Sequence, residues 1–375
     1  ISKLLNAGCT IVLVDQTGEN ESGSGKKREV TRILSPGTAI DNPVKSDNAG
    51  NNIISIVFNI GKDPSTKKPI FLAGISIIDF ITGNSFCSQI ESTPEDNKLW
   101  LDECFRIIHS YMPKEIIIGI SNNCLNEPLF KKDLLLKEFD CKDTPVFYET
   151  KIPDKYYKPV FIEDLLNKIF PNHSSYSAVD YLGLAHEEES RTSFVYLLQY
   201  AYEHDRSIIE KIKKPVNEQT SNKAVISSNA IHQLDIVSQS NNFSLMKLLD
   251  KCSTQMGKRK FQYTLLHPTT DTHILEARYD NIENLQKKIQ DKELCNVIHK
   301  ELNSIVDIEK IHRRIGLLRC HPEEMSALML SYSFIDNILN YTKECVGDLC
   351  GITDSFLKDF KELQEYLNII FNREE

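Results

Sequence analysis

The hydrophobic pattern of the chain changes near residue 177, and this change limits the folds open to it. Before that point apolar residues come in short β-branched runs, such as residues 53–59 and 115–121, which are typical of strands. Beyond it they recur three and four residues apart, as in Ile308, Ile311 and Ile315, which is typical of amphipathic helices. We therefore predict an α/β part followed by an all-α part.

Residues 53–172 predict one α/β domain. Strands are expected at residues 53–59, 71–78, 85–90, 115–121 (buried on both faces) and 145–149, and helices at 97–111, from about 127, and at 161–170. Three strands followed by alternating helices and strands predict a mixed sheet covered by helices. From residue 177 onward we expect helices only. The last of them carries an apolar stripe: Phe356, Phe360, Leu363, Leu367 and Ile370.

A short N-terminal region precedes this domain. Residues 1–7 predict a helix that Gly8 ends, residues 9–14 a buried strand, and residues 28–34 a second strand. Residues 38–52 lack periodicity and are predicted to form a linker. The chain begins without methionine and ends in a helical pattern without a stop signal, so we expect both ends to be cuts in a longer protein.

Composition narrows the classes of protein. The formal net charge of -9 argues against a surface that binds nucleic acid as a whole, although one part of an acidic protein can still meet phosphates. No apolar run is long enough to span a membrane, and the ten cysteines show no zinc or disulfide spacing. We expect a soluble, intracellular protein whose cysteines are mostly small core residues, with no metal site.

Two catalytic interpretations can be tested against the residues. The run Gly23-Ser-Gly-Lys-Lys27 only partly matches a phosphate-binding loop, because Lys27 replaces the required Ser or Thr and a strand follows instead of a helix. Asp79, at the end of a predicted strand, could begin the carboxylate cluster of an RNase H-like metal-dependent nuclease. Only Glu91 and Glu115 lie near other strand ends, so a turn or capping role for Asp79 is favoured.

Two basic clusters on predicted helices are the candidates for contact with nucleic acid. They are Lys258, Arg259 and Lys260, and Arg313 with Arg314. Acidic neighbours such as Glu309 favour the alternative, in which these side chains form ion pairs at helix surfaces.

The N-terminal region carries a family pattern. Gln16 follows the first strand, Arg28-Glu-Val30 opens the second, and Pro36-Gly37-Thr38 leaves it. This succession resembles the end of the mismatch-recognition domain of the MutS family.

Two further stretches resemble MutS proteins. Residues 244–250, Gly257 and Arg259 within 254–259, His267-Pro268-x-x-Asp271 and then Arg278 are similar to the MutS core. Residues 307–311 with 322–328 look like the lever helices, where Lys310 replaces the usual Arg. The resemblance implies three regions: the end of the recognition domain at 1–41, an RNase H-like connector at 52–172 without nuclease activity, and a helical core and lever domain at 177–375.

The resemblance also implies partners. A complete MutS protein binds double-stranded DNA with mismatches, pairs with a MutS-type dimer partner, meets a MutL-type protein through the connector, and uses ATP and Mg²⁺. The mismatch wedge, the clamp and the Walker motifs of the ATPase are not in this sequence, so no cofactor is expected in this chain. Its expected role is to link the recognition and ATPase sites. A nuclease centred on Asp79 and a helical interaction module remain the alternatives.

Overall fold

The chain folds as two compact units, described here one at a time. The first comprises Ile1–Gln219 with Ile226–Ser244, and the second Thr220–Val225 with Leu245–Glu375. The computed structural model describes residues 1–19, 26–39, 50–63, 67–93, 96, 98–125, 127–141, 144–171, 176–217, 223–224, 226–237, 243–288, 292–346 and 353–371. Most of the predicted linker at 38–52, and residues 23–25 of the glycine-rich run, lie outside these residues.

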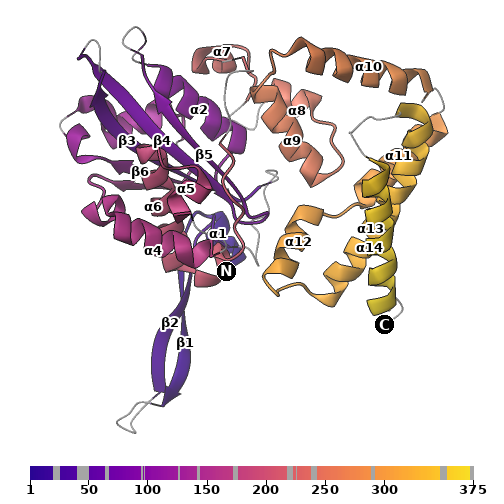
Figure 1. The fold of residues 1–375 in the computed structure, drawn as a ribbon, viewed down its shortest axis with the longest axis horizontal. Helices are drawn as coiled ribbons and strands as arrows, with labels where there is room; N and C mark the ends of the chain where they lie inside the picture. The colour runs from indigo at the N-terminus through magenta and orange to yellow at the C-terminus, as the bar shows by residue number, and fades with distance from the viewer. Residues whose placement is uncertain are drawn as a thin grey trace. The chain divides into compact units, whose positions relative to one another are not determined.

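The first unit contains the two sheets that the described residues form (Figure 1). Its strands are β1 (Ile11–Glu19), β2 (Lys26–Leu34), β3 (Asn52–Lys62), β4 (Pro69–Asp79), β5 (Asn84–Glu91), β6 (Glu115–Ile120) and β7 (Val146–Glu149). Its α-helices are α1 (Ser2–Asn6), α2 (Leu99–Tyr111), α3 (Lys132–Glu138), α4 (Pro159–Ile169), α5 (Ala178–Leu182), α6 (Glu188–His204) and α7 (Ser228–Gln233). Short 3-10 turns are η1 (Asn122–Cys124), η2 (Pro128–Phe130), η3 (Asp154–Tyr157) and η4 (Arg206–Ile209).

The larger sheet has the strand order β5-β4-β3-β6-β7. β3, β4 and β5 are antiparallel, whereas β6 and β7 continue the sheet in parallel with β3. The predicted mixed sheet is thus confirmed. Residues 212–217 run along the outer edge of β5, where the amide of Val216 donates to the Ser85 carbonyl and the amide of Cys87 to the Val216 carbonyl, at 3.0 and 3.2 Å.

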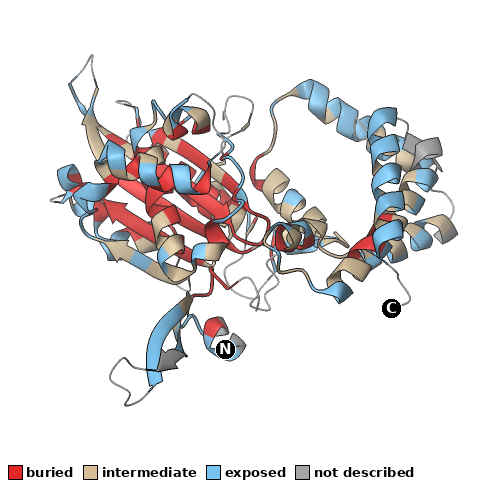
Figure 2. Cartoon of the chain, turned by 60° about the horizontal axis from the view of Figure 1, so that its bottom comes forward, coloured by how far each residue is buried: buried red, intermediate tan, exposed pale blue. Residues whose placement is uncertain are grey.

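Helices cover both faces of this sheet, which is why its strands are the most buried part of the chain (Figure 2). On one face Ile54, Ile56 and Phe58 of β3 join the α2 side chains Trp100 and Cys104 in a hydrophobic core. The opposite face packs against α6, and the Ser193 hydroxyl there donates to the Ser55 carbonyl at 2.8 Å. The helical segment predicted from residue 177 is therefore divided, since α5 and α6 belong to the sheet unit.

β1 and β2 form a separate two-stranded antiparallel ribbon. The helix end predicted before it is present as α1, and Gly8 has the left-handed φ of +76° that such an end requires. The prediction that the first strand is buried was wrong: Val12 and Val14 are both 52% exposed. A two-stranded ribbon has no further layer to cover its faces, so β-branched composition marks the strand but not its burial.

The second unit is helical, and its described residues contain no strand beyond an isolated bridge between Lys223 and Thr269. Its helices are α8 (Leu245–Leu249), α9 (Gln255–Leu266), α10 (Thr272–Lys288), α11 (Lys292–Ser304), α12 (Ile308–Gly316), α13 (Pro322–Val346) and α14 (Asp354–Ile370). A small core of Ile311, Leu328 and Tyr332 is joined by Phe360 and Leu367 of the predicted stripe. Within the described residues, no helix is long and apolar enough to cross a membrane.

Gly74 of β4 is where α6 comes closest to the sheet. A Cβ atom at this position would lie 2.0 Å from the Glu189 carbonyl carbon and 2.4 Å from the Ser190 nitrogen. We expect Gly74→Ala to destabilise the first unit by about 3 kcal/mol, because helix backbone must move to make room. Urea unfolding followed by fluorescence of Trp100, the single tryptophan, reports on this unit.

Gly61→Ala is the matched control in the same sheet, since its Cβ would meet only Leu72 Cδ1, at 3.3 Å. We expect it to change stability by less than about 1 kcal/mol. Equal effects of the two substitutions would contradict the close approach of α6 at Gly74.

Candidate functional site

The base of the ribbon is held on the sheet by a buried turn, residues 35–39, which we call the ribbon turn. Within it the Ser35 amide donates to Thr38 Oγ1 at 2.8 Å, and Pro36 and Gly37 are buried. A Cβ on Gly37 would lie 2.5 Å from Cγ1 of the buried Ile53 side chain, so only glycine fits here unless that side chain moves. The predicted Pro-Gly-Thr turn is thus present at the base of the ribbon.

Glu115, the first residue of β6, holds the ribbon turn. Its carboxylate accepts hydrogen bonds from the Ser35 hydroxyl at 3.0 Å, the Gly37 amide at 3.2 Å and the Tyr200 hydroxyl at 3.3 Å. The Asn51 side-chain amide adds a bond to the Gly37 carbonyl at 2.6 Å. One carboxylate therefore joins three segments: the ribbon turn, the sheet and the end of α6.

The electrostatic setting of Glu115 combines two opposing influences. Its side chain is buried, and this desolvation raises the pKa of the carboxyl above its ordinary value of 4.5. The hydrogen bonds from Ser35, Gly37 and Tyr200 act in the opposite direction, but burial has the larger effect. Arg32 of β2 also reaches Asp205, at 3.9 Å, and ties the ribbon to the C-terminal end of α6.

Gln16 and Arg28 occupy opposite positions on the ribbon. They are paired in register and exposed, and neither is part of the ribbon turn. Lys27 and Arg28 lie in β2, so a strand follows the glycine-rich loop, as the sequence predicted, and not the helix that a phosphate-binding loop requires.

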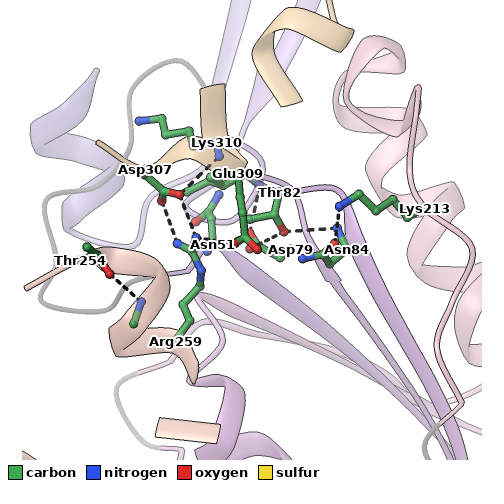
Figure 3. Close-up of polar contacts among 12 residues, drawn as sticks. Asn51, Asp79, Thr82, Asn84, Lys213, Thr254, Arg259, Asp307, Glu309 and Lys310 are labelled. Atoms are coloured by element: carbon green, nitrogen blue, oxygen red, sulfur yellow. Dashed lines mark hydrogen bonds and ion pairs between the residues drawn. The ribbon is translucent and has the colours of Figure 1, made fainter. Parts of the chain in front are cut away.

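Asp79 caps a turn at the end of β4, as favoured from the sequence. Its carboxylate accepts from the amides of Asn51 and Ile81, at 3.2 and 3.0 Å, and from the Thr82 hydroxyl at 2.8 Å (Figure 3). In the part of the chain that the structure describes, no group of three or more His, Cys, Asp or Glu residues could hold a metal ion. The described geometry therefore does not favour a nuclease centred on Asp79.

In the second unit, Arg259 joins α9 to the start of α12 (Figure 3). Its guanidinium makes two hydrogen bonds of 2.8 Å to the two oxygens of Asp307 and one of 2.6 Å to Glu309. Asp307 is also the N-cap of α12, where it accepts from the Lys310 amide. The planar guanidinium of arginine suits this bidentate geometry. We call Arg259, Asp307 and Glu309 the Arg259 joint.

Of the remaining positions that resemble the MutS core, three stand at helix ends and one, Arg278, lies within α10. Gly257 lies in the first turn of α9, where its amide donates to the N-cap Thr254 hydroxyl at 3.0 Å. Pro268 follows α9, and its carbonyl accepts from the Ala224 amide at 2.8 Å. Asp271 precedes α10 and accepts from the His273 amide at 2.9 Å, whereas Arg278 is exposed on α10.

The predicted basic clusters divide into buried and accessible residues. Arg313 and Arg314 are buried, and Arg314 bonds Glu324 at 2.9 Å and the Arg319 carbonyl at 2.9 Å. Lys258 is half-buried and Lys260 is exposed. Contact of any of these residues with DNA stays a prediction.

Half of the cysteines whose side chains the structure describes are buried, whereas we predicted that most cysteines would be. Cys87, Cys104, Cys124 and Cys141 are buried, Cys9 and Cys295 are exposed, and Cys252 and Cys320 are intermediate. The side chains of Cys345 and Cys350 lie outside the described residues.

Comparison with known protein families locates two matches. Residues 1–43 match MutS domain I, and residues 229–373 match MutS domain III. The chain is 27% identical over its whole length to a DNA mismatch repair protein mutS homolog of Acanthamoeba polyphaga mimivirus. It is also 27% identical over 97% of its length to the DNA mismatch repair protein MutS of Petrotoga mobilis, and 28% identical over 99% to that of Caldanaerobacter subterraneus.

The chain belongs to the MutS family. It covers 35%, 40% and 38%, respectively, of these three MutS relatives. The ribbon turn lies within the match to MutS domain I, and the Arg259 joint lies within the match to MutS domain III.

The ion pairs of the Arg259 joint predict that the second unit loses stability when Arg259 is replaced. Arg259→Ala leaves Asp307 and Glu309 as two neighbouring carboxylates, so we expect the helical unit to lose about 2 kcal/mol, less than a fully buried pair because Glu309 is 44% exposed. Thermal unfolding by far-ultraviolet circular dichroism measures this, with Trp100 fluorescence as the reference for the other unit. Lys260→Ala, on the same helix, should stay within about 0.5 kcal/mol; matching losses in both variants would refute a special role for Arg259.

The capping role of Asp79 predicts that its substitution lowers the stability of the first unit only. Asp79→Ala removes three hydrogen bonds to a buried turn, and we expect a loss of about 2 kcal/mol in Trp100-monitored urea unfolding. Asp79→Asn keeps one side-chain oxygen as an acceptor and should lose less. If the alanine variant unfolded at the wild-type midpoint, the capping role would be wrong.

Proposed function

We propose that this chain is the part of a MutS-type mismatch repair protein that links the recognition of mismatched double-stranded DNA to the ATPase. The observation that carries this proposal is the order of the family matches, with domain I at residues 1–43 and domain III at residues 229–373. A separate alignment with the MutS protein of Petrotoga mobilis covers 97% of the chain and supports it. The relatives are named as DNA mismatch repair proteins, which supports the same role here.

Two local features support a transmitting role. In the first unit, Glu115 fixes the base of the ribbon to the sheet through three hydrogen bonds. In the second, the Arg259 joint fixes the angle between α9 and α12 through two carboxylates. Packed elements joined by such short, directional bonds move as rigid bodies, and this is the property that coupling between distant sites uses.

The finer assignments of the family are part of the proposal. We infer that the five-stranded sheet is an RNase H-like connector, which the change from antiparallel to parallel pairing at β3 supports. In the complete protein this connector would meet a MutL-type protein, a MutS-type partner would complete a dimer, and ATP with Mg²⁺ would act at the ATPase. We assign Arg259 and Arg314 structural roles and leave phosphate contact to accessible residues such as Lys260 and Arg28.

The test is a binding titration of this chain with matched and single-mismatch duplexes at low and moderate salt. We expect weak binding that salt abolishes, because a net charge of -9 makes the chain as a whole repel phosphates and leaves only local basic residues to contact them. We expect no preference for the mismatch. A strong mismatch preference would place recognition within this chain and refute the linking role.

A parallel incubation with Mg²⁺ tests the nuclease alternative on the same duplexes. We expect no cleavage, because Asp79 accepts from the Asn51 and Ile81 amides and the Thr82 hydroxyl and serves as a cap. Cleavage that Asp79→Asn abolished would overturn both the cap assignment and the linking proposal.

A further inference from the structure

The two edges of the five-stranded sheet differ in their cover. The outer edge of β5 is bonded to residues 212–217, whereas β7 is the last strand at the other end of the sheet. Among the described residues, no strand or isolated bridge pairs with the outer edge of β7. Proteins commonly cover such an edge or mark it with lysine or proline, but the sequence of β7 is Val-Phe-Tyr-Glu. This edge is therefore open to a short further strand.

The pairing with β6 shows which backbone groups of β7 point outward. The Pro145 carbonyl accepts a hydrogen bond from the Ile116 amide at 3.0 Å, so Pro145 faces β6. Backbone groups of successive strand residues alternate in direction, and Phe147 therefore also bonds toward β6. The N–H and C=O groups of Val146 and Tyr148 then point away from the sheet. Together they offer two donors and two acceptors to an added strand.

A hollow lies beside this edge, on the face of the sheet that α6 covers. Its volume is about 190 Å³, and its lining includes Pro145, Val146 and Phe147 together with Glu115 and Tyr200. Phe147 is 48% exposed, and the centre of its ring lies 6.0 Å from that of Tyr200. The hollow is smaller than the pockets that hold drug-sized ligands, so it suits a single long side chain.

The surroundings of the hollow are acidic as well as aromatic. Three hydrogen-bond donors meet the two oxygens of Glu115, and such bonds favour the ionised carboxylate. Glu149 is two residues from Phe147 and so lies on the same face of β7, and Glu203 is exposed on α6 one turn after Tyr200. Carboxylates and the faces of aromatic rings both attract cations. The hollow therefore favours a lysine or arginine side chain and disfavours an acidic one.

We propose that the outer edge of β7 binds an extended segment of a partner protein as an added strand, with a lysine or arginine of that segment in the hollow. Hydrogen bonds to Val146 and Tyr148 hold the backbone of the segment, and the hollow selects its basic residue. Alternate side chains of an added strand point to the α6 face, so every second residue of the segment can reach that face. This binding does not rest on the linking of DNA recognition to the ATPase.

An NMR titration of the isotope-labelled whole chain with synthetic peptides tests the proposal. The probe is a blocked seven-residue peptide of alternating threonine and valine with a central lysine, and matched peptides carry norleucine or glutamate at the centre. We expect the lysine peptide to shift the amide signals of residues 146–148 at millimolar concentrations. It should bind about fivefold more tightly than the norleucine peptide, because only lysine gains the attraction of the carboxylates and rings. The glutamate peptide should not bind.

Val146→Pro tests the role of the backbone. It removes an outward N–H but leaves the bonds to β6, since proline is tolerated where the N–H of an edge strand faces solvent. We expect binding, followed at Phe147 and Tyr148, to weaken on the order of tenfold. Val160→Pro is the matched control: it also follows a proline, it is exposed in the first turn of α4, and it should bind the peptide like the wild type.

A peptide methylated at the backbone nitrogens that face β7 asks the same question of the wild-type chain, should Val146→Pro fail to fold by Trp100 fluorescence. We expect this peptide not to bind. Retained binding in either case, no shifts with the lysine peptide, equal binding of the glutamate peptide, or shifts centred on β5 would overturn the proposal. Shifts of residues 146–148 that depend on protein concentration without peptide would instead identify a second copy of the chain as the occupant, and so refute a partner segment. The titration contains no DNA, so its failure and failure of the linking role are distinguishable.

Discussion

The strongly apolar strands β3, β4 and β6 must be covered on both faces, and most of the first unit follows from this constraint. All six residues of β6 are buried, as are the first seven of β3, so neither strand offers a face to water. One layer consists of α2 with the side chains around Trp100. The other is α6, and it can approach only because glycine and serine face it at Gly74, Ser55 and Ser76. Small residues thus set the spacing of the layers, while large ones supply the apolar area.

Much of this architecture was predictable from local patterns. Each predicted strand of the five-stranded sheet is present within a few residues, because the buried apolar runs are interrupted by turn-forming residues. Gly8 and the Pro36-Gly37 turn also behave as predicted, since their backbone requirements are local. The exposure of β1 was not predictable in this way. β-branched residues favour strand geometry whether or not a second layer covers them, and Val12 shows the difference.

The side chains that hold the site together were harder to predict, because they act across long sequence separations. Glu115 lies about 80 residues from Ser35 and 85 from Tyr200. The sequence offered one signal for it, a charged residue at the start of an otherwise apolar strand, and that position alone favoured at most a weak metal ligand. Arg259 was assigned to a basic cluster, although its partners Asp307 and Glu309 lie 48 and 50 residues away. The sequence favoured ion pairs with acids such as Glu309 over contact with nucleic acid, but it did not indicate that Asp307 would be the bidentate partner of Arg259.

The edge of the larger sheet at β5 has a consequence for how the protein behaves at high concentration. Exposed strand edges carry unpaired backbone donors and acceptors, and they are the places where sheets of separate molecules join. Here residues 212–217 use the groups of Gly83, Ser85 and Cys87, and the Ser85 hydroxyl also bonds the Lys213 carbonyl at 2.6 Å. The stretch that leads out of the first unit therefore protects its edge. A change that loosened residues 212–217 would therefore expose the unpaired backbone groups of the β5 edge and favour association between molecules. The same six residues thus connect the chain onward and keep this sheet from pairing with another.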